Sequence, residues 1–184
     1  MEIADGSANQ HRRQRGGAKR SADHAELRDA ACSTVQAWLD PKQLAIWWGA
    51  HGFTNPVCDT DARPGGALRI VMRAPDGVEY PMTGVFNAIV PPERIVFTSV
   101  ARDSQDNPLL EATTTVNFAE QDGKTKLTLQ ASAVGIAASA PQMLAGMDAG
   151  WTQSLEKLSA LIENRAKPNR PFACFSRALR NAPT

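Results

Sequence analysis

Hydrophobic and polar residues alternate with a period of two between Phe53 and Leu129, which is the pattern of half-buried β-strands. Turn signals such as Pro75-Asp76-Gly77 and Gln121-Asp122-Gly123 separate the alternating stretches. Connections this short join antiparallel neighbours, so we predict a meander of about six antiparallel strands. The clearest of these strands span residues 67–73, 79–89, 94–100, 111–118 and 124–130.

Two short helices are predicted before the strands. The first begins at about residue 25 and ends near Leu39, and Ala, Leu, Val and Trp recur from Ala31 to Leu39. The second spans Pro41 to Trp48, because Asp40 is a favoured N-cap residue and proline is favoured at the first helical position. Gly49 is expected to end this helix, as glycine often does.

The longest helix is predicted near the C-terminus, from Pro141 to about Ala166. Apolar residues recur there at steps of three or four, which marks one face of an amphipathic helix. They are Met143, Met147, Trp151, Leu155, Leu158 and Ile162. We expect Gly146 and Gly150 on the same helix to permit a close approach to the sheet.

The order of helices, then strands, then one long helix indicates an α+β fold rather than alternating α/β. Only the last helix is long enough to cover one face of the sheet. We expect a disordered basic tail over residues 1–24, one domain over residues 25–166 and a second tail over residues 167–184. Residues 21–28 have almost no β-propensity.

Several motifs, taken in order, resemble one family. Ala37-Trp38-Leu39-Asp40-Pro41, with Trp47-Trp48-Gly49 after it, resembles the start of SRPBCC (START-like) proteins of the activator-of-heat-shock-protein-ATPase-homologue type. Asp61-Ala62-Arg63-Pro64-Gly65-Gly66 is similar to that family's D-x-R-x-G-G turn. Further matches occur at residues 73–77, 80–85, 91–97, 123–129 and 150–158, so the resemblance covers about residues 29–164.

The resemblance implies a helix-grip fold, in which a curved antiparallel sheet wraps a long C-terminal helix and two short helices close one end. It also implies a cavity for a hydrophobic small molecule or lipid, and membership among the bacterial single-domain relatives. The family usually has a strand just before Asp29, and the low β-propensity of residues 21–28 is a departure from it. The sequence therefore leaves open whether this strand forms.

The candidate ligand-binding residues are the aromatic, Met and Leu side chains expected to face the space between sheet and helix. They are Trp38, Trp48, Phe53, Met72, Tyr80, Phe97, Met143, Met147, Trp151 and Leu155. Aromatic walls and adaptable methionines suit an apolar guest. Ordinary core packing explains each of them as well, because large aromatic side chains dominate protein cores.

Composition narrows the partners. The formal net charge of +1 provides no overall field for nucleic acid or anionic lipid, and no apolar run is long enough to span a bilayer. Without a secretory signal pattern, a cytoplasmic location is the default. The three cysteines, Cys32, Cys58 and Cys174, are too widely spaced to predict a disulfide framework, and the three histidines are scattered. We therefore expect neither a metal nor a cofactor, and a homodimer through a sheet edge stays open.

The sequence shows no catalytic constellation, because a general base needs an orienting partner and none is evident beside His51. The leading hypothesis is therefore non-catalytic binding of an apolar or aromatic small molecule. A cyclase or aromatase acting on polyketide-like substrates is the alternative, and it requires His51, Tyr80, Asp61 or Arg63 to converge inside the cavity. A co-chaperone role ranks third, since the chain has no room for the second domain of the eukaryotic relatives.

Overall fold

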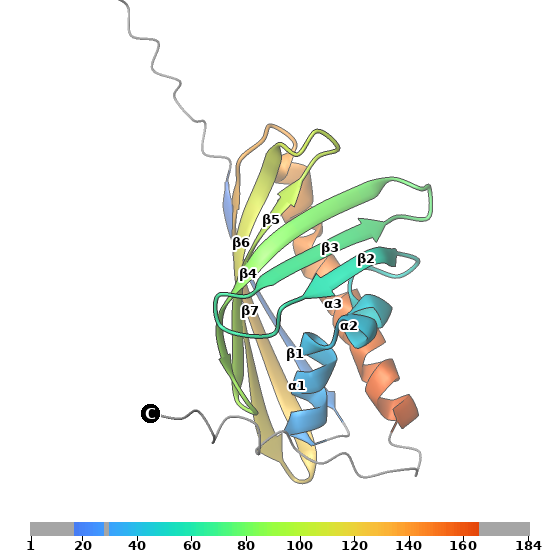
Figure 1. Ribbon diagram of the computed structural model, residues 1–184, viewed down its shortest axis with the longest axis vertical. Helices are drawn as coiled ribbons and strands as arrows, with labels where there is room; N and C mark the ends of the chain where they lie inside the picture. The colour runs from blue at the N-terminus through green and yellow to red at the C-terminus, as the bar shows by residue number, and fades with distance from the viewer. Residues whose placement is uncertain (1–16, 28–29, 166–184) are drawn as a thin grey trace, which may run out of the picture.

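The computed structural model describes residues 17–27 and 30–165 and contains one sheet with three helices (Figure 1). Its strands are β1 (Ala18–Leu27), β2 (Thr54–Thr60), β3 (Ala67–Arg73), β4 (Glu79–Val90), β5 (Arg94–Arg102), β6 (Pro108–Gln121) and β7 (Lys124–Gly135). Its helices are α1 (Ala31–Leu39), α2 (Pro41–Trp47) and α3 (Ala140–Arg165). The α+β prediction is confirmed.

The sheet is antiparallel throughout and has the order β1-β7-β6-β5-β4-β3-β2. Strands β2 to β7 form the predicted meander, in which each strand pairs with the next one along the chain. β1 joins the far edge beside β7, so the sheet has seven strands rather than about six. The curved sheet holds α3 on one side, with α1 and α2 near one end, which is the helix-grip arrangement (Figure 1).

Strand β1 corrects the expectation drawn from the N-terminal residues. Residues 18–24, which we placed in a disordered tail, and residues 25–27, which we placed in a helix, pair continuously with β7, from Ala18 opposite Val134 to Leu27 opposite Thr125. Ser21 and Leu27 are buried on its inner face. The low β-propensity is outweighed by the backbone pairing that β7 provides and by contact with α3, since strand propensity depends strongly on context.

The helix-end signals near residue 40 are confirmed. The side chain of Asp40 accepts a hydrogen bond from the backbone nitrogen of Lys42 at 2.9 Å, and Pro41 occupies the first turn of α2. Gly49 follows the C-cap with a φ of 86°, a left-handed conformation that favours glycine. Asp40 is both the C-cap of α1 and the N-cap of α2, so the chain turns directly from one helix into the next. This turn brings Trp38 and Trp47 together.

The core lies between the inner face of the sheet, defined as the face toward α3, and the C-terminal half of that helix. Leu155, Leu158 and Ile162 are buried against it, as the amphipathic pattern predicts. The inner face meets them with large fully buried side chains, among them Ile95, Val116, Leu127 and Leu129. Burying one such side chain fully contributes roughly 1.5–3 kcal/mol.

Gly146 and Gly150 do not serve the close approach that we expected of them. A Cβ atom built at either position meets nothing within 4 Å, so both glycines border open space. A close approach by glycine occurs instead in the sheet, at Gly84, where a Cβ atom would lie 2.5 Å from the carbonyl oxygen of Thr98.

Cys32 is disulfide-bonded, which the spacing of the cysteines did not lead us to expect, whereas Cys58 is free. Cys174 and the tail predictions for residues 1–16 and 167–184 fall outside the described residues.

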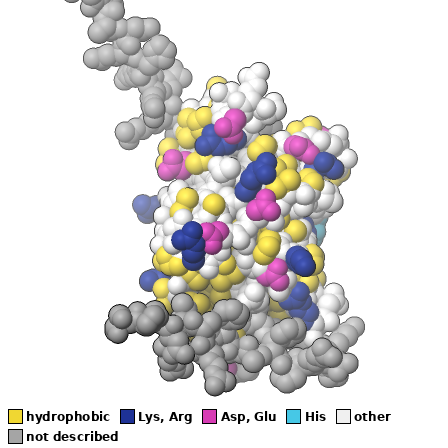
Figure 2. Space-filling view, viewed as in Figure 1, with side chains coloured by type: hydrophobic (Ala, Val, Ile, Leu, Met, Phe, Trp, Pro, Cys, Tyr) yellow, Lys and Arg dark blue, Asp and Glu magenta, His cyan; other side chains and the backbone are white. Residues whose placement is uncertain are grey.

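Within the described ranges, no helix combines the length and the apolar character needed to span a bilayer. Basic and acidic side chains are interspersed on the described part of the face in Figure 2.

Candidate functional site

Four tryptophans and a phenylalanine form one aromatic cluster between the helices and the sheet. Trp38 of α1 is its centre, with ring centroids 4.5 Å from Trp47, 6.3 Å from Trp48 and 6.3 Å from Trp151. Phe97 of β5 lies 6.0 Å from Trp48 and 6.4 Å from Trp38. Ring separations in this range stabilise aromatic pairs, so the cluster joins α1, α2, α3 and the sheet.

The indole nitrogens of the cluster differ in their hydrogen bonding. Trp47 Nε1 donates to the backbone oxygen of Ala37 at 2.9 Å. Trp38 Nε1 is buried and has no hydrogen-bond partner among the described residues. An unpaired buried donor has a free-energy cost, so Trp38 is held in place by its ring contacts and not by a polar contact.

The predicted ligand-binding residues divide by burial. Trp38, Trp48, Phe97 and Leu155 are at most 6% exposed and belong to the core. The other six have exposed surface: Phe53, Met72, Met143, Met147 and Trp151 are half-buried, and Tyr80 is 36% exposed. The first group is packed in the core, and the second group provides the accessible apolar surface.

Two of the accessible residues lie on the side of the sheet toward its β2 edge. The rings of Phe53 and Tyr80 are 6.1 Å apart, which joins the start of β2 to β4. Met72 of β3 packs on the core beside Gly49. The contact is close, because a Cβ atom added at Gly49 would lie 3.3 Å from the methionine sulfur. Apolar contacts therefore connect the loop after α2 with strands β3 and β4.

Helix α3 is packed unevenly along its length. Its C-terminal half buries Leu155, Leu158 and Ile162. Its N-terminal half buries Ala140 and Leu144, whereas Met143 and Met147 are only half-buried. Two polar contacts with β1 fix the alignment of the helix on the sheet. Lys19 Nζ lies 2.6 Å from Asp148 Oδ2, and Thr152 Oγ1 donates to Asp23 Oδ1 at 3.3 Å.

The sheet register then shows which side chains lie beneath each half of α3. Residues that pair in register from strand to strand form rows across the inner face. The row of Asp23 continues with large residues, namely Leu129, Val116 and Ile95. Lys19 is level with a row of small residues, namely Ala133, Ala112, Ser99 and Gly84. The row between these two consists of Ser21, Ala131, Thr114, Phe97 and Phe86. The row level with Lys19, to which Asp148 of α3 is attached, therefore consists of small side chains on β7, β6, β5 and β4.

On its other side, α3 is bound to the loop that follows α2. The backbone nitrogen of His51 donates to Gln153 Oε1 at 2.9 Å, and His51 Nε2 lies 2.7 Å from Glu156 Oε2. Lys157 Nζ donates to the backbone oxygens of Trp48 and Gly49, each at 3.3 Å. Partial burial lowers the pKa of Lys157. These contacts close the space between sheet and helix next to the aromatic cluster.

The four polar residues that the enzyme hypothesis requires do not converge. Asp61 and Arg63 pair with each other at 2.8 Å in the exposed turn between β2 and β3. His51 pairs with Glu156 at the surface, and the Tyr80 ring packs against Phe53 at an interplanar angle of 41°. The described residues also contain no group of three or more His, Cys, Asp or Glu side chains placed to hold a metal ion.

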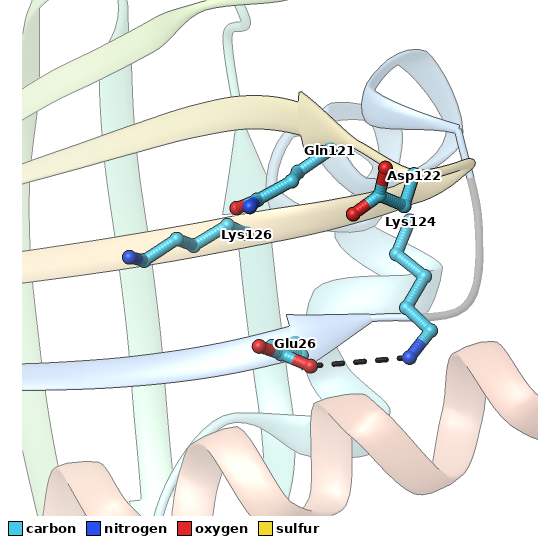
Figure 3. A pocket seen from close by; sticks show the side chains of 5 residues that line it. All are labelled: Glu26, Gln121, Asp122, Lys124 and Lys126. Atoms are coloured by element: carbon cyan, nitrogen blue, oxygen red, sulfur yellow. Dashed lines mark ion pairs between the residues drawn. The ribbon is translucent and has the colours of Figure 1, made fainter.

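A separate polar hollow of about 90 Å³ lies at the hairpin between β6 and β7, beside the end of β1 (Figure 3). It is lined by Glu26, Gln121, Asp122, Lys124 and Lys126, and Lys124 Nζ is 3.9 Å from Glu26 Oε2. These side chains lie away from the inner face, so this hollow is not between the sheet and α3.

A family model described as "Activator of Hsp90 ATPase homolog 1-like protein" matches residues 35–163. The chain belongs to this family. The match includes the aromatic cluster and α3 up to Glu163, and the fold agrees with the SRPBCC resemblance seen in the motifs. No curated protein matches the chain.

Solved structures from bacteria share the fold. Protein CV1439 from Chromobacterium violaceum is 29% identical with a TM-score of 0.68, and the alignment covers 78% of this chain and 96% of that one. Protein Ms6760 from Mycobacterium smegmatis is 25% identical with a TM-score of 0.64, covering 85% and 99%. The AHSA1 protein SPO3351 from Silicibacter pomeroyi is 24% identical with a TM-score of 0.66, covering 80% and 99%, and shows the fold alone.

Sequence reasoning found the large members of the site and missed the small ones. Ser99, Ala112, Thr114 and Ala133 were not among the predicted residues, although their register places them beneath α3. The alternation along β5 and β6 did contain a signal, because each has small inward residues near one end and large ones near the other. Only the pairing of the strands shows that the small ends coincide.

Proposed function

We propose that this protein binds an apolar or aromatic small molecule between the inner face of the sheet and the N-terminal half of α3. The observation that carries the proposal is the change in side-chain size along the inner face. Large residues fill the region under Leu155, Leu158 and Ile162, and small residues replace them under the preceding turns.

The facing surface of α3 compensates for the small residues only in part. Protein interiors are close-packed, so a row of Ala and Ser in a continuous core is normally matched by larger side chains opposite. Leu144 and Ala140 are buried on this half of α3, but Met143 and Met147 stay half-buried, and a Cβ atom at Gly146 or Gly150 would meet nothing within 4 Å. This arrangement supports room for a guest at this end of the molecule.

The chemistry of the walls indicates the class of guest. Met82, Met143 and Met147 are flexible thioether side chains that adapt to irregular apolar shapes. Trp151 ends the space on the side of the aromatic cluster and offers a ring face for stacking. Apolar walls with a few polar groups are typical of small-molecule sites.

A cavity-filling substitution tests the proposal. Ala112 is half-buried at the centre of the small row, so Ala112→Leu places a larger side chain where the guest would lie. We expect tetralin, a bicyclic hydrocarbon, to bind the wild-type protein in calorimetric titration and to bind Ala112→Leu at least tenfold more weakly. Ala119→Leu is the matched control, because Ala119 is exposed on the same strand.

Two results would contradict the proposal: no tetralin binding by the wild-type protein, or equal affinities for the wild-type protein and Ala112→Leu. Native mass spectrometry of freshly purified protein gives an independent measurement, in which a copurified apolar molecule is expected. No observation on the described residues favours the cyclase alternative or the chaperone activation to which the family name refers, and we propose neither.

A further inference from the structure

We infer that the bound molecule carries an uncharged oxygen, a carbonyl or a hydroxyl, which is held by the side-chain hydroxyls of Ser99 and Thr114. This inference rests on the proposed function and specifies the chemistry of its ligand. Ser99 is 7% exposed and Thr114 is 1% exposed, and both lie on the inner face beneath the N-terminal half of α3.

The two hydroxyl groups are directed inward by strand alternation. On β5, Ser99 shares the face of the buried Ile95 and Phe97, and on β6, Thr114 shares the face of Val116. Side chains two residues apart on a strand lie on the same face. Their surroundings are Phe97, Ala112, Ala131 and Ala133, none of which has a polar side chain.

Among the described residues, neither hydroxyl forms a side-chain hydrogen bond, and neither oxygen is one of the fully enclosed unpaired atoms, which are Trp38 Nε1 and Asn55 Oδ1. The two oxygens therefore keep a small accessible surface on an otherwise buried face, and a hydroxyl with so little access to a partner costs free energy. Alanine and valine would fill the same two positions without that cost. A ligand oxygen supplies the missing partner and explains why polar residues are placed here.

The sheet register sets a suitable spacing. Ser99 lies opposite Ala112, and Thr114 is two residues further along β6, so Ser99 and Thr114 are diagonal neighbours. Diagonal pairs are about 7–8 Å apart between Cα atoms. One oxygen atom placed between two hydroxyls, at about 2.8 Å from each, bridges such a pair.

The charges nearby favour a neutral group. Lys19 is level with Ser99 across the sheet, but its ammonium group is already paired with Asp148 at 2.6 Å. A hydroxyl group both donates and accepts hydrogen bonds, so Ser99 and Thr114 suit a ketone oxygen or an alcohol equally. An anionic ligand group would not gain an unpaired cation at this end of the site.

The test compares tetralin with 1-tetralone, which has the same skeleton and one ketone oxygen. The measured quantity is the ratio of their dissociation constants, tetralin over 1-tetralone, from calorimetric titration. In Ser99→Ala/Thr114→Val we expect this ratio to fall three- to tenfold, with tetralin affinity unchanged. Thr113→Val is the control on the outer face, because Thr113 is an exposed neighbour of Thr114, and there the ratio should stay as in the wild-type protein.

A ratio that is unchanged in Ser99→Ala/Thr114→Val, with tetralin still bound, would overturn this inference and leave the proposed function intact. Failure of both compounds to bind the wild-type protein would overturn both. Thermal unfolding of ligand-free Thr114→Val gives a second measurement. We expect a melting temperature equal to or above that of the wild-type protein, and a clear decrease would show that the hydroxyl has a structural partner.

Discussion

Lys19 Nζ lies 2.6 Å from Asp148 Oδ2 and so joins edge strand β1 to the N-terminal half of α3. Thr152 and Asp23 form a second contact one helical turn further on. Leu144, one turn before Asp148, is buried, whereas Met147 and Trp151 are half-buried. The ion pair therefore adds to the apolar contacts that hold this part of the helix on β1.

Breaking the pair should loosen the first turns of α3. We expect Lys19→Gln to accelerate hydrogen–deuterium exchange at the amides of residues 143–150 and to leave those of residues 155–162 unchanged. Lys124→Gln is the control, because Lys124 forms a looser pair with Glu26, at 3.9 Å, away from the helix. Equal exchange in Lys19→Gln and the wild-type protein would show that apolar contacts alone hold the segment.

The same pair sets a dependence on pH. Hydrogen bonding from Lys19, with Ser21 as a second donor, lowers the pKa of Asp148 below 3.8. A carboxyl whose pKa is lower in the folded than in the unfolded protein stabilises the fold above the unfolded value, and this effect is lost as pH falls through the folded value. Exchange at residues 143–150, corrected for its intrinsic pH dependence, should stay constant down to about pH 4 and rise only at more acidic pH.

The two halves of α3 should respond differently to truncation. Leu158 is fully buried, so Leu158→Ala should lower the free energy of unfolding by about 2–5 kcal/mol. Met143 is half-buried at the open end, so Met143→Ala should cost less than about 1.5 kcal/mol. Urea unfolding followed by circular dichroism measures both, and similar losses would contradict the uneven packing of the helix.

The glycines of α3 should be replaceable. A Cβ atom at Gly146 meets nothing within 4 Å, and glycine in a helix is less favourable than alanine by about 0.8–1.0 kcal/mol. Gly146→Ala should therefore raise the melting temperature. Gly84→Ala is the contrasting variant and should lower it, because its Cβ atom would collide with the backbone of Thr98. A decrease in Gly146→Ala would mean that the helix approaches another element there.

Cys58 should react slowly with alkylating agents. Burial, together with the negative charges of Asp59 and Asp40, raises the pKa of its thiol from 9.0 to about 11. Near pH 8 this reduces the thiolate, which is the reactive form, by roughly a hundredfold. Peptide mapping after iodoacetamide treatment should show slow labelling of Cys58 in the native protein and fast labelling in urea, and equal rates would contradict the raised pKa.

The sequence was sufficient for most of the fold because its local signals agree. Period-two alternation located β3 to β7, and the Asp40-Pro41 pair located the start of α2. β1 was not predictable in this way, since Ala18–Leu27 has little β-propensity and is held by β7 and α3. Its pairing is a long-range property that no local pattern contains.

The site was predictable only in part, for a related reason. Large aromatic residues such as Trp38 and Trp151 were expected to face the sheet, and the structure brings their rings within 6.3 Å. The small residues Ser99 and Ala112 are unremarkable in the sequence and become informative only when the register places them side by side. Which end of the inner face has the smaller side chains depends on that register.

Because α3 is packed unevenly, its two halves should differ in the free energy needed to open their backbone amides. Residues from Leu155 onward are anchored by buried side chains, so their amides open only when the core does. The turns before Trp151 bury only Ala140 and Leu144 and leave Met143 and Met147 half-buried, so fewer buried contacts hold them. Backbone amides in the first half of the helix should therefore open at a lower free energy than those in the anchored half.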